Sequence, residues 1–242
     1  MINTRIQPHI RRVNLIGLSH SGKSTFAKAL AARLFDKYHI DADILEEEFK
    51  DRAYESDSRL PTLYDEIQAF FRQMEREEAR LRASSELVVI NDSGLWTIVF
   101  YINELFRDQC DDPYTGKIYL DNNRACALGK GLSYHGGVQF FELLARVMDD
   151  TYKTLNIIFE PIANARPIGR WREHIPSEYL LNKFRNFTIQ TGVAKYAEFV
   201  SLQGVANNGV NFGIIVDNIV DRLVLSPKPK KETKRDMAVN CD

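Results

Sequence analysis

The chain has 242 residues, 44% of them hydrophobic and 27% charged, which is the composition of a folded globular protein rather than a disordered or fibrous one. Its formal net charge of −1 provides no overall field that would draw the protein to nucleic acid or to an anionic membrane. No apolar run approaches the roughly 20 residues of a transmembrane helix, and residues 1–14 lack the apolar core of a signal peptide, so we expect neither a membrane protein nor an exported one.

Short apolar runs alternate with amphipathic segments along the whole chain. The short runs are typical of buried strands, and the longer segments carry apolar residues at helical spacing. Strands are predicted over residues 13–16, 39–44, 87–90, 155–159 and 197–202, and helices over residues 24–38, 63–81, 95–106, 140–148, 177–190 and 212–225. This alternation predicts a three-layer α/β fold, in which five mainly parallel strands are covered by helices on both faces.

We expect a single domain over residues 1–225, because this length can bury one substantial core. Residues 111–137 are rich in Gly, Asn and Asp and show weak periodicity, so no element is predicted at their centre. Residues 226–242 have little apolar content and more basic than acidic side chains, which predicts a disordered basic tail.

A glycine-rich segment joins the first strand to the first helix. It reads Gly17-Leu18-Ser19-His20-Ser21-Gly22-Lys23-Ser24, which is the G-x-x-x-x-G-K-S spacing of a phosphate-binding loop, or P-loop. The glycines allow backbone N–H groups to turn onto phosphates, and the helix that follows adds the positive end of its dipole. The predicted nucleotide-binding residues are Gly17, Ser19, His20, Ser21, Gly22, Lys23, Ser24 and Thr25. Lys23 is expected to reach the β- and γ-phosphates, and the Ser24 hydroxyl to bind Mg²⁺.

Two motifs that accompany nucleotide hydrolysis are missing from this sequence. The Asn182-Lys183 pair is not followed by the aspartate of the guanine-reading N-K-x-D motif. Asp92, after the strand at residues 87–90, is followed by Ser93 rather than by a glutamate that would activate water. Both absences favour transfer of a phosphoryl group to an acceptor over hydrolysis.

Four sequence blocks resemble those of small-molecule kinases. The block GLSHSGKSTFAKALAARL resembles the opening of adenylylsulfate kinases and nucleoside kinases, with an AAA-type ATP-binding P-loop. The blocks VVINDSGLWTIVFYINEL, TLNIIFEP and RPIGRWREHIPSEYLLNKF resemble, in this order, blocks of the ribosylnicotinamide kinase-like P-loop family. The resemblance covers most of residues 12–225. It implies a P-loop NTPase fold with a lid near residues 161–176, and an enzyme that uses ATP and Mg²⁺ to phosphorylate a hydroxyl group of a nucleoside-like small molecule.

Acidic residues near two strand ends are candidates for the chemistry that this resemblance implies. Asp92 is expected beside the phosphate loop, where it would hold Mg²⁺, orient the acceptor or cap the following helix. Asp41 and Asp43 are expected to close the second strand at the same edge of the sheet. Asp43 is the preferred general base or sugar-binding group, and an ordinary polar strand end is the alternative.

Further candidates lie in the later blocks. Arg166, Arg170 and Arg172 are expected in the lid, where Arg170 would contact the transferring phosphoryl group unless these arginines are only surface charge. Trp96 is expected either to stack on a ring of the substrate or to pack in the core. Asn208, after the fifth strand, is expected near the adenine.

Two other functions stay open at this point. The basic tail would suit a kinase that acts on polymerised DNA or RNA, but the acidic remainder of the chain favours a small-molecule acceptor. A nucleotide-gated regulatory module without transfer is a third possibility. The three cysteines form no CxxC pair and suit a reducing compartment, so we expect a cytoplasmic protein of undetermined oligomeric state.

Overall fold

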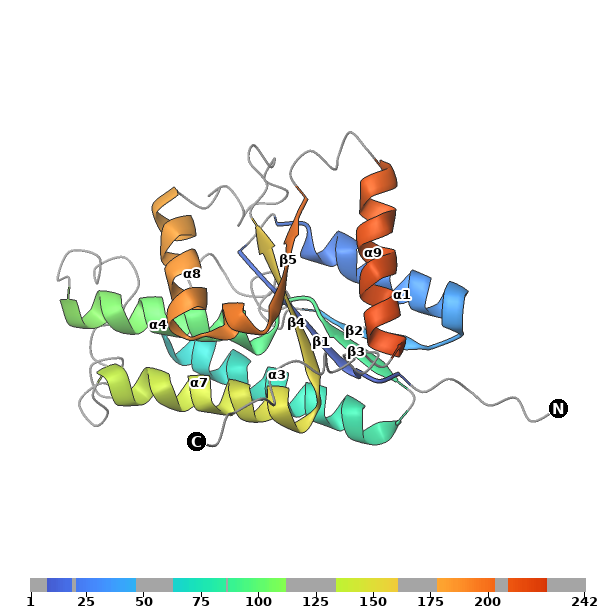
Figure 1. Cartoon of the computed structure of the whole chain (residues 1–242). Coiled ribbons are helices and arrows are strands. Elements are labelled where there is room, and N and C mark those ends of the chain that lie inside the picture. Colours follow the sequence, from blue (N-terminus) through green and yellow to red (C-terminus); the bar gives the residue numbers. More distant parts are fainter. Residues whose placement is uncertain are drawn as a thin grey trace, which may run out of the picture.

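The computed structural model describes residues 8–18, 21–46, 63–85, 87–111, 134–160, 178–202 and 209–225. Within these ranges strands and helices alternate (Figure 1). The strands are β1 (Arg12–Ile16), β2 (Ala42–Leu45), β3 (Val88–Asn91), β4 (Thr154–Glu160) and β5 (Ala197–Ser201). The helices are α1 (Lys23–Tyr38), α3 (Leu63–Ala83), α4 (Leu95–Asp111), α7 (Tyr134–Thr151), α8 (Glu178–Gln190), the short 3₁₀ helix η1 (Val193–Lys195) and α9 (Gly209–Val224).

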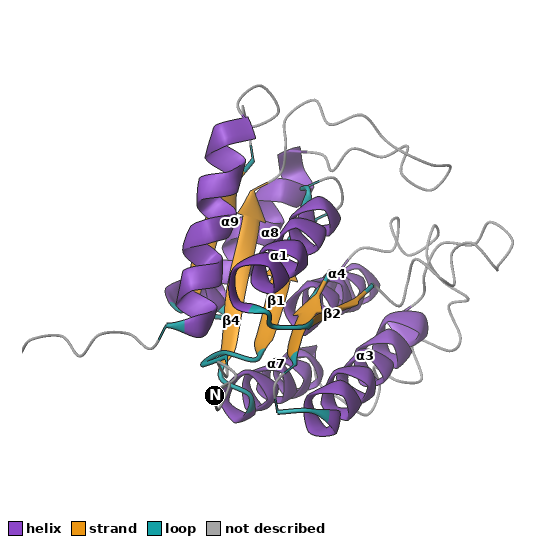
Figure 2. Cartoon of the chain, turned by 90° about the vertical axis from the view of Figure 1, so that its right-hand side faces the viewer, coloured by secondary structure: helices purple, strands orange, loops and turns teal. Residues whose placement is uncertain are grey.

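The five strands form one parallel sheet in the order β2-β3-β1-β4-β5. Helices α1 and α9 pack on one face of the sheet, and helices α3, α4, α7 and α8 pack on the other (Figure 2). This arrangement confirms the predicted three-layer α/β fold. Strand β1 lies at the centre, so the loop that follows it lies at the middle of the carboxyl edge of the sheet.

The two faces of β1 differ in character because successive side chains of a strand point to opposite sides. Val13 and Leu15 are fully buried in the apolar core formed with α1 and α9. On the opposite face, Ile16 packs among α3, α4 and α7, but Arg12 and Asn14 are polar and equally buried. These two polar residues therefore need partners within the core.

Some predicted boundaries differ from the observed ones. The second strand begins at Ala42 rather than at residue 39, because His39 ends α1 in a left-handed conformation (φ 54°) and donates its N–H to the Phe35 carbonyl. Helix α7 extends beyond the predicted residues 140–148 at both ends. The 3₁₀ turn η1 was not predicted, because it follows a left-handed Gly192 (φ 74°) after an otherwise ordinary helix.

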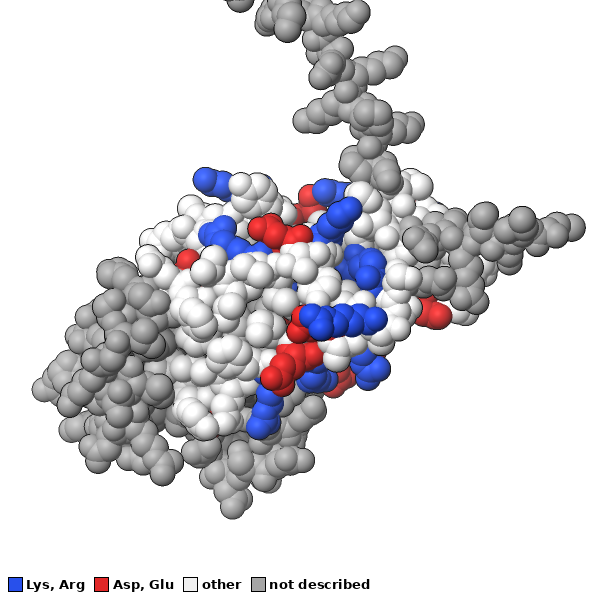
Figure 3. All heavy atoms as spheres, turned by 90° about the horizontal axis from the view of Figure 1, so that it is seen from below, with Lys and Arg blue, Asp and Glu red and all other residues white. Residues whose placement is uncertain are grey.

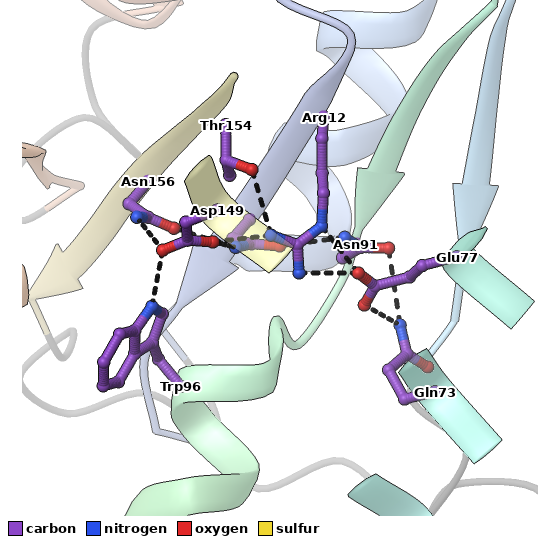
Figure 4. Close-up of polar contacts among 9 residues, drawn as sticks. Arg12, Gln73, Glu77, Asn91, Trp96, Asp149, Thr154 and Asn156 are labelled. Carbon is purple, nitrogen blue, oxygen red and sulfur yellow. Dashed lines mark hydrogen bonds and ion pairs between the residues drawn. The ribbon is translucent and has the colours of Figure 1, made fainter. Parts of the chain in front are cut away.

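Arg12 is the centre of a buried polar network beneath the sheet (Figure 4). Its Nε atom donates to Glu77 Oε2 at 2.7 Å, and its Nη1 atom donates to Asp149 Oδ1 at 2.5 Å and to Thr154 Oγ1 at 3.0 Å. The side chains of Arg12 and Glu77 are fully buried. Burial raises the pKa of the Glu77 carboxyl, and the positive charge of Arg12 opposes that rise.

Three asparagines extend this network across the central strands. Asn14 is in register with Asn91 of β3 and with Asn156 of β4. Asn91 Nδ2 donates to Asn14 Oδ1 at 2.9 Å, and Asn14 Nδ2 donates to Asn156 Oδ1 at 2.8 Å. Asn156 Nδ2 then donates to Asp149 Oδ2 at 2.7 Å. Because a slip of one residue would turn an asparagine to the apolar face, the row favours a single strand register.

We predict that Arg12→Met destabilises the fold by about 3–5 kcal/mol, because it leaves the carboxylates of Glu77 and Asp149 buried without their cation. The free energy of unfolding, measured by urea denaturation, tests this. Arg33→Met is the matched control, since Arg33 binds Asp217 at the surface and a surface ion pair adds little. Equal destabilisation by the two substitutions would contradict a special role for the buried cation.

Candidate active site

The predicted phosphate loop follows the carboxyl end of β1 and leads directly into α1. Gly22 is the N-cap of α1 and has φ 87° and ψ 9°, a left-handed conformation that glycine adopts without strain. No side chain caps α1 by a hydrogen bond, and its first turn contains no acidic residue. Its first N–H groups and the positive end of its dipole therefore face the loop, which is the arrangement that binds anions.

Gly17 is held in a position that has no room for a side chain. A Cβ atom there would lie 3.0 Å from Ser21 Oγ and 3.1 Å from Phe159 Cβ. The Gly17 N–H donates to Thr97 Oγ1 of α4 at 3.3 Å. The start of the loop is therefore fixed against both β4 and α4.

The Lys23 ammonium group lies within the curve of this loop. Its Nζ atom donates to the carbonyl oxygens of Gly17 at 2.7 Å and Leu18 at 2.9 Å, and it lies 3.5 Å from Ser21 Oγ. The side chain is buried, although it carries a charge. The loop carbonyl groups compensate for this burial and keep the cation at the place where bound phosphates are expected.

Ser24 and Asp92 meet at the carboxyl edge of the sheet, although 68 residues separate them in the sequence. Ser24 Oγ donates to Asp92 Oδ2 at 2.5 Å. The Asp92 N–H donates to the Leu45 carbonyl at 2.9 Å, which ties the end of β3 to the end of β2. Hydroxyl and carboxylate oxygens are suitable ligands for Mg²⁺, so this pair fits the predicted metal site.

Asp41 and Asp43 do not lie at that edge, contrary to expectation. Strand β2 spans Ala42–Leu45, so Asp41 precedes the strand and Asp43 is its second residue. Asp43 pairs in register with Val89 near the start of β3, and its Oδ2 atom lies 3.1 Å from Arg80 Nε at the end of α3. The expectation that these two aspartates close the strand is therefore wrong, because β2 ends at Leu45, and their assignment to the acceptor site stays a prediction without the position that motivated it.

Glu46 is the acidic residue that follows β2 at the carboxyl edge. It comes directly after Leu45, whose carbonyl accepts the Asp92 N–H, and its side chain is exposed. Glu46 was not among the candidates that the sequence indicated. The signal that would have identified it is the apolar pair Ile44-Leu45, which marks the true end of the strand.

Trp96 packs in the core, so the packing interpretation holds and the stacking one does not. Its side chain is 1% exposed, and its indole N–H donates to Asp149 Oδ2 at 2.8 Å, away from the phosphate loop.

Thr25 is exposed in the first turn of α1. The other predicted site residues lie outside the described residues: Ser19, His20, Arg166, Arg170, Arg172 and Asn208. The same is true of the predicted lid and tail.

The described ranges of the chain contain neither a membrane-spanning helix nor a side-chain cluster suited to a metal ion. None of the helices in these ranges is long and apolar enough to cross a bilayer. The histidine, cysteine, aspartate and glutamate residues there form no group of three or more that could hold a metal ion.

Comparison with known proteins agrees with this geometry. Residues 12–126, a little less than half of the chain, match the family model of an AAA domain. A NadR protein in complex with NR superposes with a TM-score of 0.55 at 15% identity, over 90% of this chain and 53% of that one. Thymidylate kinase from Candida albicans superposes with a TM-score of 0.55 at 12% identity, over 91% of this chain and 97% of that one. Curated proteins gave no significant match.

These similarities concern the fold. The chain has the α/β fold of P-loop kinases, as its sequence blocks predict, and it spans about half of the length of the NadR chain. At such low identity the superpositions do not carry the substrate of either protein to this one.

We predict that Thr97→Val weakens the binding of Mg-ATP about fivefold, because the Gly17 N–H loses its acceptor, a loss of about 1 kcal/mol. Calorimetric titration measures this change. Thr188→Val is the matched control, since Thr188 is also a buried threonine on a helix but its hydroxyl donates to the Arg185 carbonyl of the same helix, α8. The same loss of affinity in both variants would show that Thr97 has no specific effect on the loop.

Proposed function

We propose that this protein is an ATP-dependent kinase that transfers the γ-phosphoryl group to a hydroxyl of a nucleoside or nucleoside-like small molecule. The observation that carries the proposal is the contact between Ser24 and Asp92 beside the buried ammonium group of Lys23. A cation for the phosphates and a pair of oxygen ligands thus meet at one end of the central strand. Phosphoryl transfer depends mainly on such positioning and charge neutralisation.

Each part of the site has a separate task in this proposal. The backbone around Gly17 and Gly22 would bind the phosphates, together with the predicted Ser19 and His20. Lys23 would reach the β- and γ-phosphates. Ser24 and Asp92 would hold Mg²⁺, which supplies positive charge to the phosphate oxygens when it is bound. Asn208 remains the residue proposed near the adenine.

The acceptor side of the site would be formed from the end of β2. Glu46 lies at the carboxyl edge of the sheet. It directly follows Leu45, whose carbonyl accepts the Asp92 N–H. It would orient the acceptor hydroxyl and take its proton as the phosphoryl group transfers. The lid arginines Arg166, Arg170 and Arg172 would approach from residues 161–176, with Arg170 on the transferring group. A kcat that Arg170→Ala leaves unchanged would exclude that role.

The names of structurally similar proteins support the choice of cofactor and acceptor class. A NadR protein was solved with NR, and again with NAD and AMP-PNP, an analogue of ATP, in a structure that superposes with a TM-score of 0.53 at 16% identity. The other similar structure is a thymidylate kinase. Ligands that contain a nucleoside recur on this fold, so a nucleoside-like acceptor is the first class to test.

The net charge favours a small acceptor over polymerised nucleic acid, because the formal value of −1 supplies no general attraction for phosphates. On the face that Figure 3 shows, opposite the carboxyl edge of the sheet, the described Lys and Arg side chains lie among Asp and Glu side chains rather than in a basic stripe. Several described cations form ion pairs, such as Arg82 with Glu78 on α3. A nucleic acid would need a continuous basic surface to bind its phosphates.

We predict that the purified protein, with Mg²⁺ and ATP labelled at the γ-phosphate, phosphorylates at least one member of a panel of nucleosides. Lys23→Ala should abolish this transfer, because the charge on the transferring phosphates is no longer neutralised. Lys28→Ala is the matched control, since Lys28 is an exposed lysine on the same helix. Transfer is measured as labelled product after chromatographic separation from ATP.

Other results would contradict the proposal and identify the alternative. Transfer to oligonucleotides alone, with steep inhibition by salt, would indicate a nucleic-acid kinase. Tight binding of Mg-ATP without acceptor-dependent turnover would indicate a regulatory module. Equal transfer by Lys23→Ala and Lys28→Ala would show that the phosphate loop does not catalyse the reaction.

We predict that Glu46→Gln lowers kcat about 10²-fold or more, because the acceptor hydroxyl loses its general base, while ATP binding changes little. Asp43→Asn, on the strand that precedes Glu46, is the matched control, and it should leave kcat unchanged because Asp43 binds Arg80 two residues before the end of that strand. Steady-state kinetics at saturating ATP give both values. A larger effect of Asp43→Asn than of Glu46→Gln would reverse the assignment.

A further inference from the structure

A cavity lies against the first residues of β4, away from the phosphate loop. Its volume is about 510 Å³, which is within the usual range of small-molecule sites. Side chains from α4, α7, β4 and the η1 turn line it, among them Trp96, Arg146, Asp150, Lys153, Thr154 and Tyr196. Thr154 is in register with the first residue of β1, whereas the phosphate loop follows the last, so the two places lie toward opposite ends of the sheet.

The inner wall of this cavity is held rigidly by the buried network (Figure 4). Asp149 accepts hydrogen bonds from Arg12, Asn14, Trp96 and Asn156, so its carboxylate is fully engaged. The charge of Asp149 is offset by Arg12. This wall therefore presents little net negative charge to a ligand.

Two cations, Arg146 and Lys153, line the cavity. The Arg146 guanidinium lies 5.4 Å from the centroid of the Trp96 ring, and one of its N–H groups donates to the Thr191 carbonyl. Its positive charge also acts on Glu142 of the same helix, where it opposes the rise in pKa that burial causes. Asp150 lines the cavity and opposes one of the two positive charges. Among the lining side chains, with Asp149 offset by Arg12, the two cations therefore outnumber the one remaining carboxylate.

The outer part of the cavity offers an apolar surface beside these cations. The Tyr196 side chain is 77% exposed, and it has no ring contact among the described residues. Val193 is buried three residues earlier, at the start of η1, and adds an apolar contact to the lining. Thr154 Oγ1 accepts from Arg12, which leaves its own hydrogen available for a ligand. An exposed aromatic ring beside cations suits a flat ring that carries an anionic group.

We propose that this cavity binds a small organic anion with one flat ring or ring system, of the size of a nucleoside monophosphate or an aromatic carboxylate. The phosphate or carboxylate group contacts Arg146 and Lys153, and the ring packs on Tyr196. The site uses none of the residues assigned to phosphoryl transfer, so it stands independently of that proposal.

The fluorescence of Trp96 provides a direct test. The chain has two tryptophans, so Trp171→Phe leaves Trp96 in the cavity wall as the sole reporter. In this full-length variant, titration with adenosine 5′-monophosphate, benzoate and inorganic phosphate is expected to change the emission with at least one of the two ring-bearing probes. Arg146→Gln and Lys153→Ala should each raise the Kd about tenfold, because each removes a charged partner of the anion. Lys195→Ala, an exposed lysine next to Tyr196, should leave the Kd unchanged.

A probe bound in the cavity should keep its affinity in Lys23→Ala, which separates this site from the phosphate loop. Loss of the signal in Lys23→Ala would place the probe at the loop and overturn the proposal. No change in emission up to millimolar probe, or equal Kd values in Arg146→Gln and the parent, would also overturn it. Binding of inorganic phosphate as tightly as the ring-bearing probes would exclude the ring from the site. Preference for the monophosphate or for benzoate would identify which anionic group the cavity selects.

Discussion

Arg12 is a fully buried cation at the start of the central strand. The packing of α3 and α7 against the sheet depends on the carboxylates that these helices provide to Arg12. Arg12 binds Glu77 from α3 and Asp149 from α7, so one guanidinium group joins the sheet to two helices that are far apart in the sequence. An isolated charge at this depth would be very costly, and therefore both helices must be in place for the strand to be buried. The polar network thus makes the packing of this layer an all-or-none property.

The same network positions the active-site edge. The asparagine row aligns β1 with β3 and β4, and this register brings the loop after β1 next to the residues after β3. Gly94 makes the approach possible, because a Cβ atom there would lie 2.6 Å from Asn14 Cβ. The Gly94 N–H donates to the Leu15 carbonyl at 3.1 Å, one residue after that contact. The meeting of Ser24 with Asp92 is therefore a consequence of strand register in the core.

The sequence predicted those features that local patterns determine. The phosphate loop, the parallel sheet and the order of elements follow from short-range spacing, and the structure confirms the fold. The sequence assigned no role to Arg12, because its partners lie 65 and 137 residues away and no local pattern indicates them. For the same reason the sequence did not show that Trp96 binds Asp149, which lies 53 residues away. Asp43 was misplaced for a different reason: the boundaries of the second strand were set too early, whereas the strand runs from Ala42 to Leu45.

Asp92 links the two halves of the proposed reaction. Its carboxylate binds Ser24 on the nucleotide side, and its N–H binds the carbonyl of Leu45, the residue that precedes Glu46 on the acceptor side. The nucleotide half is built largely from backbone groups and a short motif, so it can persist across proteins that share little sequence. In the proposal, the acceptor half would be formed by side chains after the edge strand β2, which pairs with only one neighbouring strand in the described sheet. Because β2 is less constrained than β1, acceptor choice can change there while the phosphate site stays the same.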